Sequence, residues 1–259
     1  MRTISVANHK GGVGKTATAH TLGVALARDY HQRVLLVDID PQASLSGSCG
    51  VIDAAENSLA EVLGGAMPGK LPIQEAIRKI DTNLWLLPAD IALAVTELGL
   101  VSRMNRDSVL KNKLEEVRDQ FDIALIDCPP SLGMLTINAL TASNGVLLPT
   151  QPQSVDLRGM QLFLDTLDQV RSELNPSIET IGVLPTFYDG RLIHHQDALH
   201  AMTGAGLPVL PVQIGRTVRI AEAAHEGESV LTYAPENPQA KAYQRLAEEV
   251  SRWLENGQV

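Results

Sequence analysis

The sequence is poor in aromatic side chains and in positive charge, and each shortage excludes a class of function. Aromatic residues make up 3% of the 259 residues, too few for the stacking surfaces that bind single-stranded nucleic acid. The formal net charge of −9 argues against a small domain that coats DNA, because such domains are usually basic. Any contact with nucleic acid must therefore come from a local cluster of basic residues.

Cysteine is also scarce, and long apolar runs are missing. Cys49 and Cys128 lie far apart and form no CxxC motif, so a zinc or iron–sulfur site has no support. We expect Cys128 to be a small packing residue. No run reaches the roughly 18 apolar residues that span a bilayer, and no signal peptide precedes the first expected strand. With so little cysteine, the sequence predicts a cytoplasmic protein.

Short apolar runs alternate with helical patterns along most of the chain. Such runs are typical of parallel strands that are covered on both faces, and the spacing between them predicts helices. The expected strands are 2–8, 33–38, 83–88, 122–127, 145–149, 178–184 and 209–213, and the expected helices are 16–30, 107–120, 133–143, 155–173, 192–204, 217–225 and 238–256. Residues 50–80 follow no clear pattern. The alternation predicts an α/β fold, a mostly parallel twisted β-sheet flanked by helices on both faces, in a single domain over 1–259.

The segment HKGGVGKT, residues 9–16, follows the first expected strand and opens the first expected helix. A phosphate-binding loop of the P-loop type requires that context. Its glycines let backbone N–H groups turn toward phosphate oxygens, and the helix N-terminus adds a positive dipole. We expect Lys15 to reach the β- and γ-phosphates and the Thr16 hydroxyl to bind Mg²⁺. The loop is unusual because it has His9 where the usual motif has glycine, and a second lysine, Lys10.

Aspartates close two of the expected strands. Asp38 and Asp40 end the second strand, and alternation places their side chains on the same side, with Ile39 opposite. Carboxylates at the carboxyl ends of parallel strands can orient the attacking water or hold Mg²⁺ through water. Asp127 ends the apolar run IALID, which is the Walker B arrangement that serves Mg²⁺. A turn or helix-capping role is the alternative for Asp40, which precedes Pro41.

Together these segments resemble the ParA/MinD family of ATPases. KGGVGKT (10–16) is similar to that family's deviant Walker A motif, DIDPQ (38–42) to its second motif, and DCPPSLG (127–133) to its DxPP segment. The resemblance implies that ATP is buried between two subunits and that Lys10 reaches the partner's nucleotide. It also implies that Asp40 activates water in a slow, partner-stimulated hydrolysis. The implied catalytic residues are Lys10, Lys15 and Asp40, and the implied Mg²⁺ residues are Thr16, Asp38 and Asp127, the aspartates through water.

Two segments of the second half, 186–191 and 214–219, also resemble ParA segments. In that family the first lies near adenine and the second usually contains I-P-R-N, where this chain has Gly215 and Thr217 in place of the proline and the asparagine. The nucleotide-binding residues that the resemblance implies are Lys10, Gly11, Gly12, Val13, Gly14, Lys15, Thr16, Ala17, Thr186, Ile214, Gly215 and Arg216.

A DNA-facing basic patch is expected at Arg191, Arg216 and Arg219. Attraction to phosphate needs only clustered arginine or lysine and is independent of DNA sequence. Ordinary solvated arginines are the alternative, and Glu226 and Glu228 would repel DNA, most strongly at low salt. We interpret His194 and His195 as surface helix residues, since no further metal ligands accompany them.

The resemblance implies a ParA-like partition ATPase with ATP and Mg²⁺ as cofactors. ATP would drive a sandwich homodimer that binds DNA non-specifically and is nucleoid-associated, and a ParB-like partner protein would stimulate hydrolysis and release. The cargo, a chromosome, a plasmid or a protein assembly, stays open. A MinD-like regulator acting on membrane or protein cargo is the first alternative, but residues 238–256 mix basic and acidic residues on their polar face, whereas a membrane anchor favours a basic one. A metal- or electron-delivery ATPase and a non-enzymatic nucleotide-binding scaffold are the others.

Overall fold

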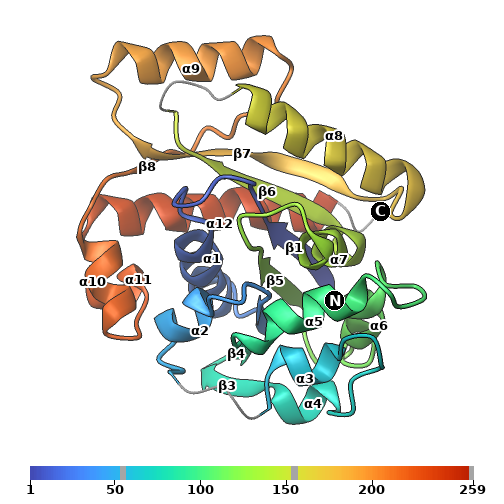
Figure 1. Cartoon of the computed structure of the whole chain (residues 1–259). Helices are drawn as coiled ribbons and strands as arrows, with labels where there is room; N and C mark the ends of the chain where they lie inside the picture. The colour runs from blue at the N-terminus through green and yellow to red at the C-terminus, as the bar shows by residue number, and fades with distance from the viewer. Residues whose placement is uncertain (53–56, 153–156, 257–259) are drawn as a thin grey trace.

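The computed structural model describes residues 1–52, 57–152 and 157–256. Eight strands form a sheet in the order β3-β4-β2-β5-β1-β6-β7-β8 (Figure 1). Neighbouring strands run parallel, except that β3 pairs antiparallel with β4, which confirms the mostly parallel sheet. The strands are β1 Arg2–Val6, β2 Val34–Asp38, β3 Arg78–Asp81, β4 Leu84–Leu87, β5 Ile123–Asp127, β6 Gly145–Thr150, β7 Glu179–Tyr188 and β8 Ile214–Gly215.

Helices cover both faces of this sheet, as expected. They are α1 Lys15–Asp29, α2 Ser44–Ser48, α3 Leu59–Leu63, α4 Ile73–Ala76, α5 Ala92–Leu100, α6 Val109–Glu115, α7 Met134–Ala142, α8 Leu157–Glu173, α9 Ile193–Gly204, α10 Arg219–His225, α11 Val230–Tyr233 and α12 Pro238–Asn256. Successive residues of β2 show why both faces need cover. Leu35 and Val37 join the core beneath α3–α9, whereas Val34 and Leu36 join the core beneath α1, α2 and α10–α12.

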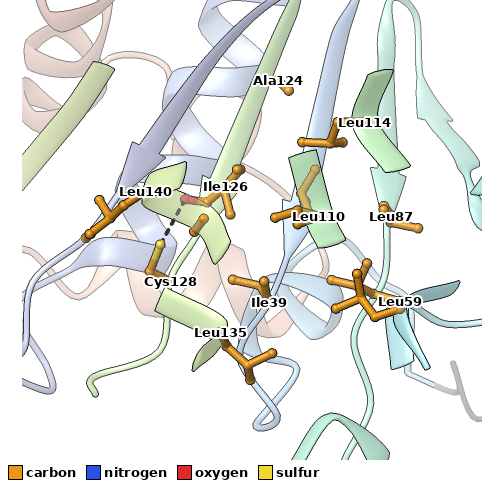
Figure 2. Close-up of a cluster of buried hydrophobic side chains, with 14 of the residues drawn as sticks. Ile39, Leu59, Leu87, Leu110, Leu114, Ala124, Ile126, Cys128, Leu135 and Leu140 are labelled. Atoms are coloured by element: carbon orange, nitrogen blue, oxygen red, sulfur yellow. Dashed lines mark hydrogen bonds between the residues drawn. The ribbon is translucent and has the colours of Figure 1, made fainter. Parts of the chain in front are cut away.

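The first of these cores reaches the edge of the sheet where the strands end. Figure 2 shows Leu110 and Leu135, from two helices, near Ile126 and the neighbouring Cys128, with Leu59 from a third helix on the Ile39 and Leu87 side of the cluster. Cys128 is 1% exposed, as a packing residue should be. Burial and the Asp127 charge raise the pKa of its thiol. The chain that follows β5 is therefore anchored by apolar packing just beyond the last strand residue.

The prediction of a strand at 209–213 was wrong. Val209 makes only an isolated bridge to Val183, and the edge strand β8 lies at Ile214–Gly215 instead. Pro208 and Pro211 explain the shift, because proline has no N–H to donate to the strand ladder. Residues 155–156 of one expected helix lie outside the described residues. The elements α2–α5, β3 and α11 were not predicted.

The C-terminal helix α12 packs as the apolar stripe of the sequence indicates. Six of its residues are almost fully buried in the core that contains α1: Ala240, Ala242, Tyr243, Leu246, Ala247 and Val250. The Tyr243 hydroxyl also lies 3.3 Å from the Thr18 hydroxyl of α1. None of the helices in the described ranges is long and apolar enough to cross a bilayer.

Candidate functional site

The loop between β1 and α1 has the backbone of a phosphate cradle. Gly12 and Gly14 have φ angles of 71° and 85°, in the left-handed region that glycine adopts without a steric penalty. Helix α1 begins at Lys15, and the residue before it, Gly14, makes no side-chain cap. The first N–H groups of α1 therefore suit an anionic ligand, whose negative charge the helix dipole also favours.

The two lysines of the loop have different surroundings. Lys15 is 7% exposed, and its Nζ donates a hydrogen bond of 3.0 Å to the backbone oxygen of Lys10. Burial lowers the pKa of Lys15, and the nearby Asp127 and Asp40 charges oppose that shift. The side chain of Lys10, by contrast, is exposed, and its backbone N–H is held by Asn8 Oδ1 at 3.0 Å. Lys15 thus belongs to its own loop, whereas Lys10 stands at the rim.

A cavity of about 500 Å³ opens over this loop, a size that suits a small-molecule ligand. Most of the expected nucleotide-binding residues line it: Gly11, Gly12, Gly14, Lys15, Thr16, Ala17, Thr186, Ile214 and Gly215. Val13 lies behind the wall and contributes its carbonyl, which accepts a 2.8 Å hydrogen bond from Thr186 Oγ1. Lys10 and Arg216 do not line the cavity. Arg216 lies instead over the ring of Phe187, 5.4 Å from its centroid.

Two aspartates lie side by side beneath the cavity, because β2 and β5 pair in register at Asp38 and Asp127. Both are almost fully buried. Burial raises the pKa of Asp38 to about 6. Burial and the Asp38 charge raise the pKa of Asp127 well above its ordinary value, while Thr16 and Lys15 oppose the shift. Two buried carboxylates so close together favour a cation between or beside them.

The carboxylates of Asp38 and Asp127 differ in their hydrogen bonds. Asp38 Oδ2 accepts bonds of 2.8 Å from both the backbone N–H and the hydroxyl of Ser46, and Oδ1 accepts one from the Asp40 N–H. Asp38 is thus committed to the turn after β2. Among the described residues no hydrogen-bond donor lies within 3.5 Å of either oxygen of Asp127, although the nearby Thr16 hydroxyl favours its charged form. Such buried orphans need a ligand, and with the neighbouring Thr16 hydroxyl they offer the oxygen ligands that Mg²⁺ prefers.

Asp40 combines the two interpretations made for it. Its Oδ1 accepts a 2.9 Å hydrogen bond from the Gln42 N–H, as a turn aspartate does. The same side chain also lines the cavity that the phosphate loop lines. Pro130, from the segment after β5, lines the same cavity and lies close to Gly11. The ends of β1, β2 and β5 therefore contribute to one site.

The arginines of the expected basic patch are largely paired. Arg191 binds Asp189 through two nitrogens, at 2.9 and 2.7 Å, and Arg219 binds Glu222 at 2.7 Å. Within the described ranges Arg216 has no ion-pair partner closer than 4.0 Å. The positive charge expected here is consequently smaller than a count of arginines suggests.

The interpretation of His195 as a surface residue was wrong. Its side chain is 2% exposed, its Nδ1 accepts a 3.0 Å hydrogen bond from the Asp189 N–H, and its ring packs against Tyr188. His194 is exposed, as expected. The sequence reasoning also missed His20 in the cavity wall. The helical spacing of four residues from Thr16 would have identified it, because residues four apart share one helix face.

Comparison with known proteins gives matches over almost the whole chain. The family described as "AAA domain" matches residues 1–180. The chromosome-partitioning ATPase Soj of Thermus thermophilus is 41% identical over 254 residues, which are 96% of this chain and 95% of that protein. The chromosome partitioning protein ParA of Caulobacter vibrioides is 38% identical over 96% of this chain and 94% of its own length.

Solved structures agree with this fold. A cobyrinic acid a,c-diamide synthase from Mycobacterium smegmatis, with bound ADP and magnesium, is 38% identical with a TM-score of 0.86, covering 100% of this chain and 97% of that one. The cell division ATPase MinD of Pyrococcus furiosus is 29% identical with a TM-score of 0.77, covering 97% and 99%.

Proposed function

Because this chain belongs to the ParA/MinD family of ATPases, with ATP and Mg²⁺ as cofactors, we propose that it is a partition switch. In this proposal ATP joins two copies of the chain, and the joined form binds DNA without sequence preference. A ParB-like partner protein then stimulates hydrolysis, which separates the copies and releases the DNA. The names of the Thermus and Caulobacter relatives, which refer to chromosome partitioning, support this choice of cargo.

The observation that carries the proposal is the unequal use of two lysines in one loop. Lys15 is buried and bonded within its own cradle, but Lys10 is exposed at the rim and does not line the cavity. A cation in that position can stabilise phosphate charge brought by another molecule. A second copy of the chain, with its own nucleotide, is the partner that this arrangement fits.

An apolar surface beside the site supports the second copy. Ile91, directly before α5, and Val95 and Leu98 within it share one face by their helical spacing and are 70%, 72% and 75% exposed. Helix α5 follows the carboxyl end of β4, the same edge that carries the phosphate loop. Its Glu97 accepts a hydrogen bond from the Leu135 N–H, just after the segment that approaches the loop. Clustered exposed apolar residues of this kind are typical of interfaces.

The residues of the site have the roles that phosphoryl transfer to water requires. Lys15, Lys10 and the loop N–H groups stabilise the phosphate charge. Thr16 and Asp127 are the residues that would hold Mg²⁺, with Asp38 acting through water and through the turn that it fixes. When bound, the ion polarises the phosphate oxygens. Asp40, at the cavity wall, orients the attacking water.

Two functions carried by similar proteins are less well supported. A diamide synthase that draws nitrogen from glutamine needs a nucleophilic thiolate, but burial raises the pKa of both Cys49 and Cys128. A MinD-like membrane anchor needs a free apolar face with a basic polar face. The apolar stripe of α12 is buried in the core, and its Arg252 is paired with Glu249.

The proposal is tested by the mass of the protein in solution with ATP and Mg²⁺. We expect the Asp40→Ala variant to bind ATP, to lose roughly 10²-fold or more in turnover because water is no longer oriented, and to accumulate as a dimer in light scattering. The Lys10→Ala, Asp40→Ala double variant should bind ATP as a monomer. A strictly monomeric Asp40→Ala protein at saturating ATP would contradict the proposal, as would a double variant that still dimerises.

A further inference from the structure

The end of β7 contains an irregularity at a single residue, Phe187. Thr186 pairs with Ile214 of β8 and Tyr188 pairs with Gly215, so Phe187 is an extra residue in the ladder. Its φ of 51° lies in the left-handed region, which a bulky side chain rarely occupies. Bulges of this kind redirect a side chain next to functional sites. The bulge therefore fixes where the Phe187 ring lies.

The ring of Phe187 forms part of the wall between two cavities. One is the nucleotide cavity, and the other is a second cavity of about 330 Å³; Phe187 and Gly215 line both. On one side the ring faces the phosphate loop, since a Cβ on Gly14 would lie 3.7 Å from Phe187 Cε2. On the other side it supports the guanidinium of Arg216. Phe187 thus contacts the loop that binds nucleotide and the cation of the second cavity.

One residue that lines the second cavity has a buried hydrogen-bond donor without a partner. That residue is His195. Because His195 Nδ1 accepts the Asp189 N–H, the proton of the neutral ring is on Nε2. That buried nitrogen has no hydrogen-bond partner among the described residues. A donor in this state favours any ligand that brings an acceptor oxygen.

The charges around this donor favour an anion. Arg191, Arg216 and Asp189 line the same cavity, which leaves one net positive charge. The Arg191 side chain is 90% exposed, and an exposed ion pair contributes little to stability. Arg191 can therefore exchange Asp189 for a phosphate, to which a guanidinium donates two parallel hydrogen bonds.

We propose that the second cavity seats one phosphate group of a nucleic acid backbone and that Phe187 makes its occupancy depend on the nucleotide. This inference rests on the proposed function, because it explains how nucleotide binding would change the position of an arginine that faces DNA. Thr186 Oγ1 is bonded to the phosphate loop at Val13. A movement of that loop on ATP binding is transmitted to β7, to the Phe187 ring and hence to Arg216.

The donor is tested by DNA affinity in a salt series with ATP. His195→Asn keeps an acceptor near the Nδ1 position but loses the Nε2 donor, whereas His195→Gln places an amide donor near Nε2. We expect His195→Asn to weaken binding about 10-fold without changing the salt slope, because a neutral donor releases no counterion. Arg216→Gln should lower the slope by about 0.9. His195→Gln should restore affinity, and His200→Asn, on the exposed side of α9, is the matched control.

Inorganic phosphate tests the cavity without DNA. With the phosphate loop filled by ATP in the Asp40→Ala protein, phosphate should shift the His195 ring resonances in the ¹⁵N spectrum, and Arg216→Gln should abolish the shift. Displacement of phosphate by duplex DNA identifies the backbone as the ligand. A shift with polyglutamate but with neither phosphate nor DNA overturns the proposal in favour of an acidic protein partner, and no shift at all overturns it too. Failure of the Asp40→Ala protein to dimerise with ATP would contradict the proposed function alone, whereas a protein that dimerises but shows no displacement of phosphate by DNA would contradict the present proposal.

The coupling is tested by comparing affinities in ATP and in ADP. Phe187→Leu removes the ring that supports Arg216 but keeps an apolar side chain against the loop. We expect the ratio of DNA affinities in ATP and ADP to fall toward one in this variant, while Phe187→Tyr keeps the wild-type ratio. Each DNA affinity is measured at saturating nucleotide, because Phe187 also lines the nucleotide cavity and its replacement changes the surroundings of ATP. An unchanged ratio in Phe187→Leu would remove Phe187 from the coupling.

Discussion

Replacement of Lys15 should lower the affinity for ATP strongly. Its ammonium is buried under the cavity and spans the loop to the Lys10 carbonyl. Lys15→Ala removes the charge-assisted hydrogen bonds to phosphate, so ATP affinity in calorimetry should fall by roughly 10²-fold. Lys70→Ala changes an exposed lysine far along the chain and should bind as the wild type does. Retained affinity in Lys15→Ala would contradict the assignment of the loop.

Residues whose role depends on local sequence were predictable, and residues whose role depends on packing were not. The phosphate loop and Asp127 follow from a strand, a turn and a helix that are contiguous in sequence. The burial of His195 depends on how the chain returns onto Tyr188 and the Asp189 N–H. The position of Arg216 likewise depends on a bulge in the neighbouring strand, which the sequence pattern of β7 does not reveal.

At the scale of elements, the turn between α3 and α4 should depend on its glycines, and Gly69 is the most closely packed of them. A Cβ on Gly69 would lie 2.1 Å from the carbonyl oxygen of Val62, and backbone cannot move as a side chain can. Gly69→Ala should therefore lower the free energy of unfolding by about 2 kcal/mol or more, measured by urea denaturation. Gly47→Ala in α2 meets nothing within 4 Å and should be neutral or stabilising by up to about 1 kcal/mol. Equal midpoints for the two variants would contradict this account.

The same turn shows why some elements were predictable and others were not. The six inner strands β4, β2, β5, β1, β6 and β7 are covered on both faces, so their apolar runs are conspicuous in the sequence. Between β2 and β4, however, the chain forms the helices α2, α3 and α4, of four or five residues each, and the short edge strand β3. Such elements are shorter than the window in which helical periodicity can be recognised, and glycines and prolines interrupt them.

For the whole molecule, the net charge of −9 opposes the proposed contact with DNA, so local charge must decide the outcome. Arg219 of α10 shares its helix with Glu222, and the exposed Glu226 follows that helix directly. Glu226→Gln removes one negative charge beside the DNA-facing arginines. We expect it to raise DNA affinity a few-fold at low salt and not at high salt, where the Debye length falls to about 3 Å at 1 M.

Glu75→Gln is the matched control for this prediction, because it changes the net charge equally. Glu75 lies in α4, just before β3 at the opposite edge of the sheet from β8. Its replacement should leave DNA affinity unchanged, since charges that are farther apart than a Debye length are screened from each other. If the two variants raised affinity equally, the overall field of the protein would govern DNA binding. If neither did, the surface that includes α10 would not face DNA.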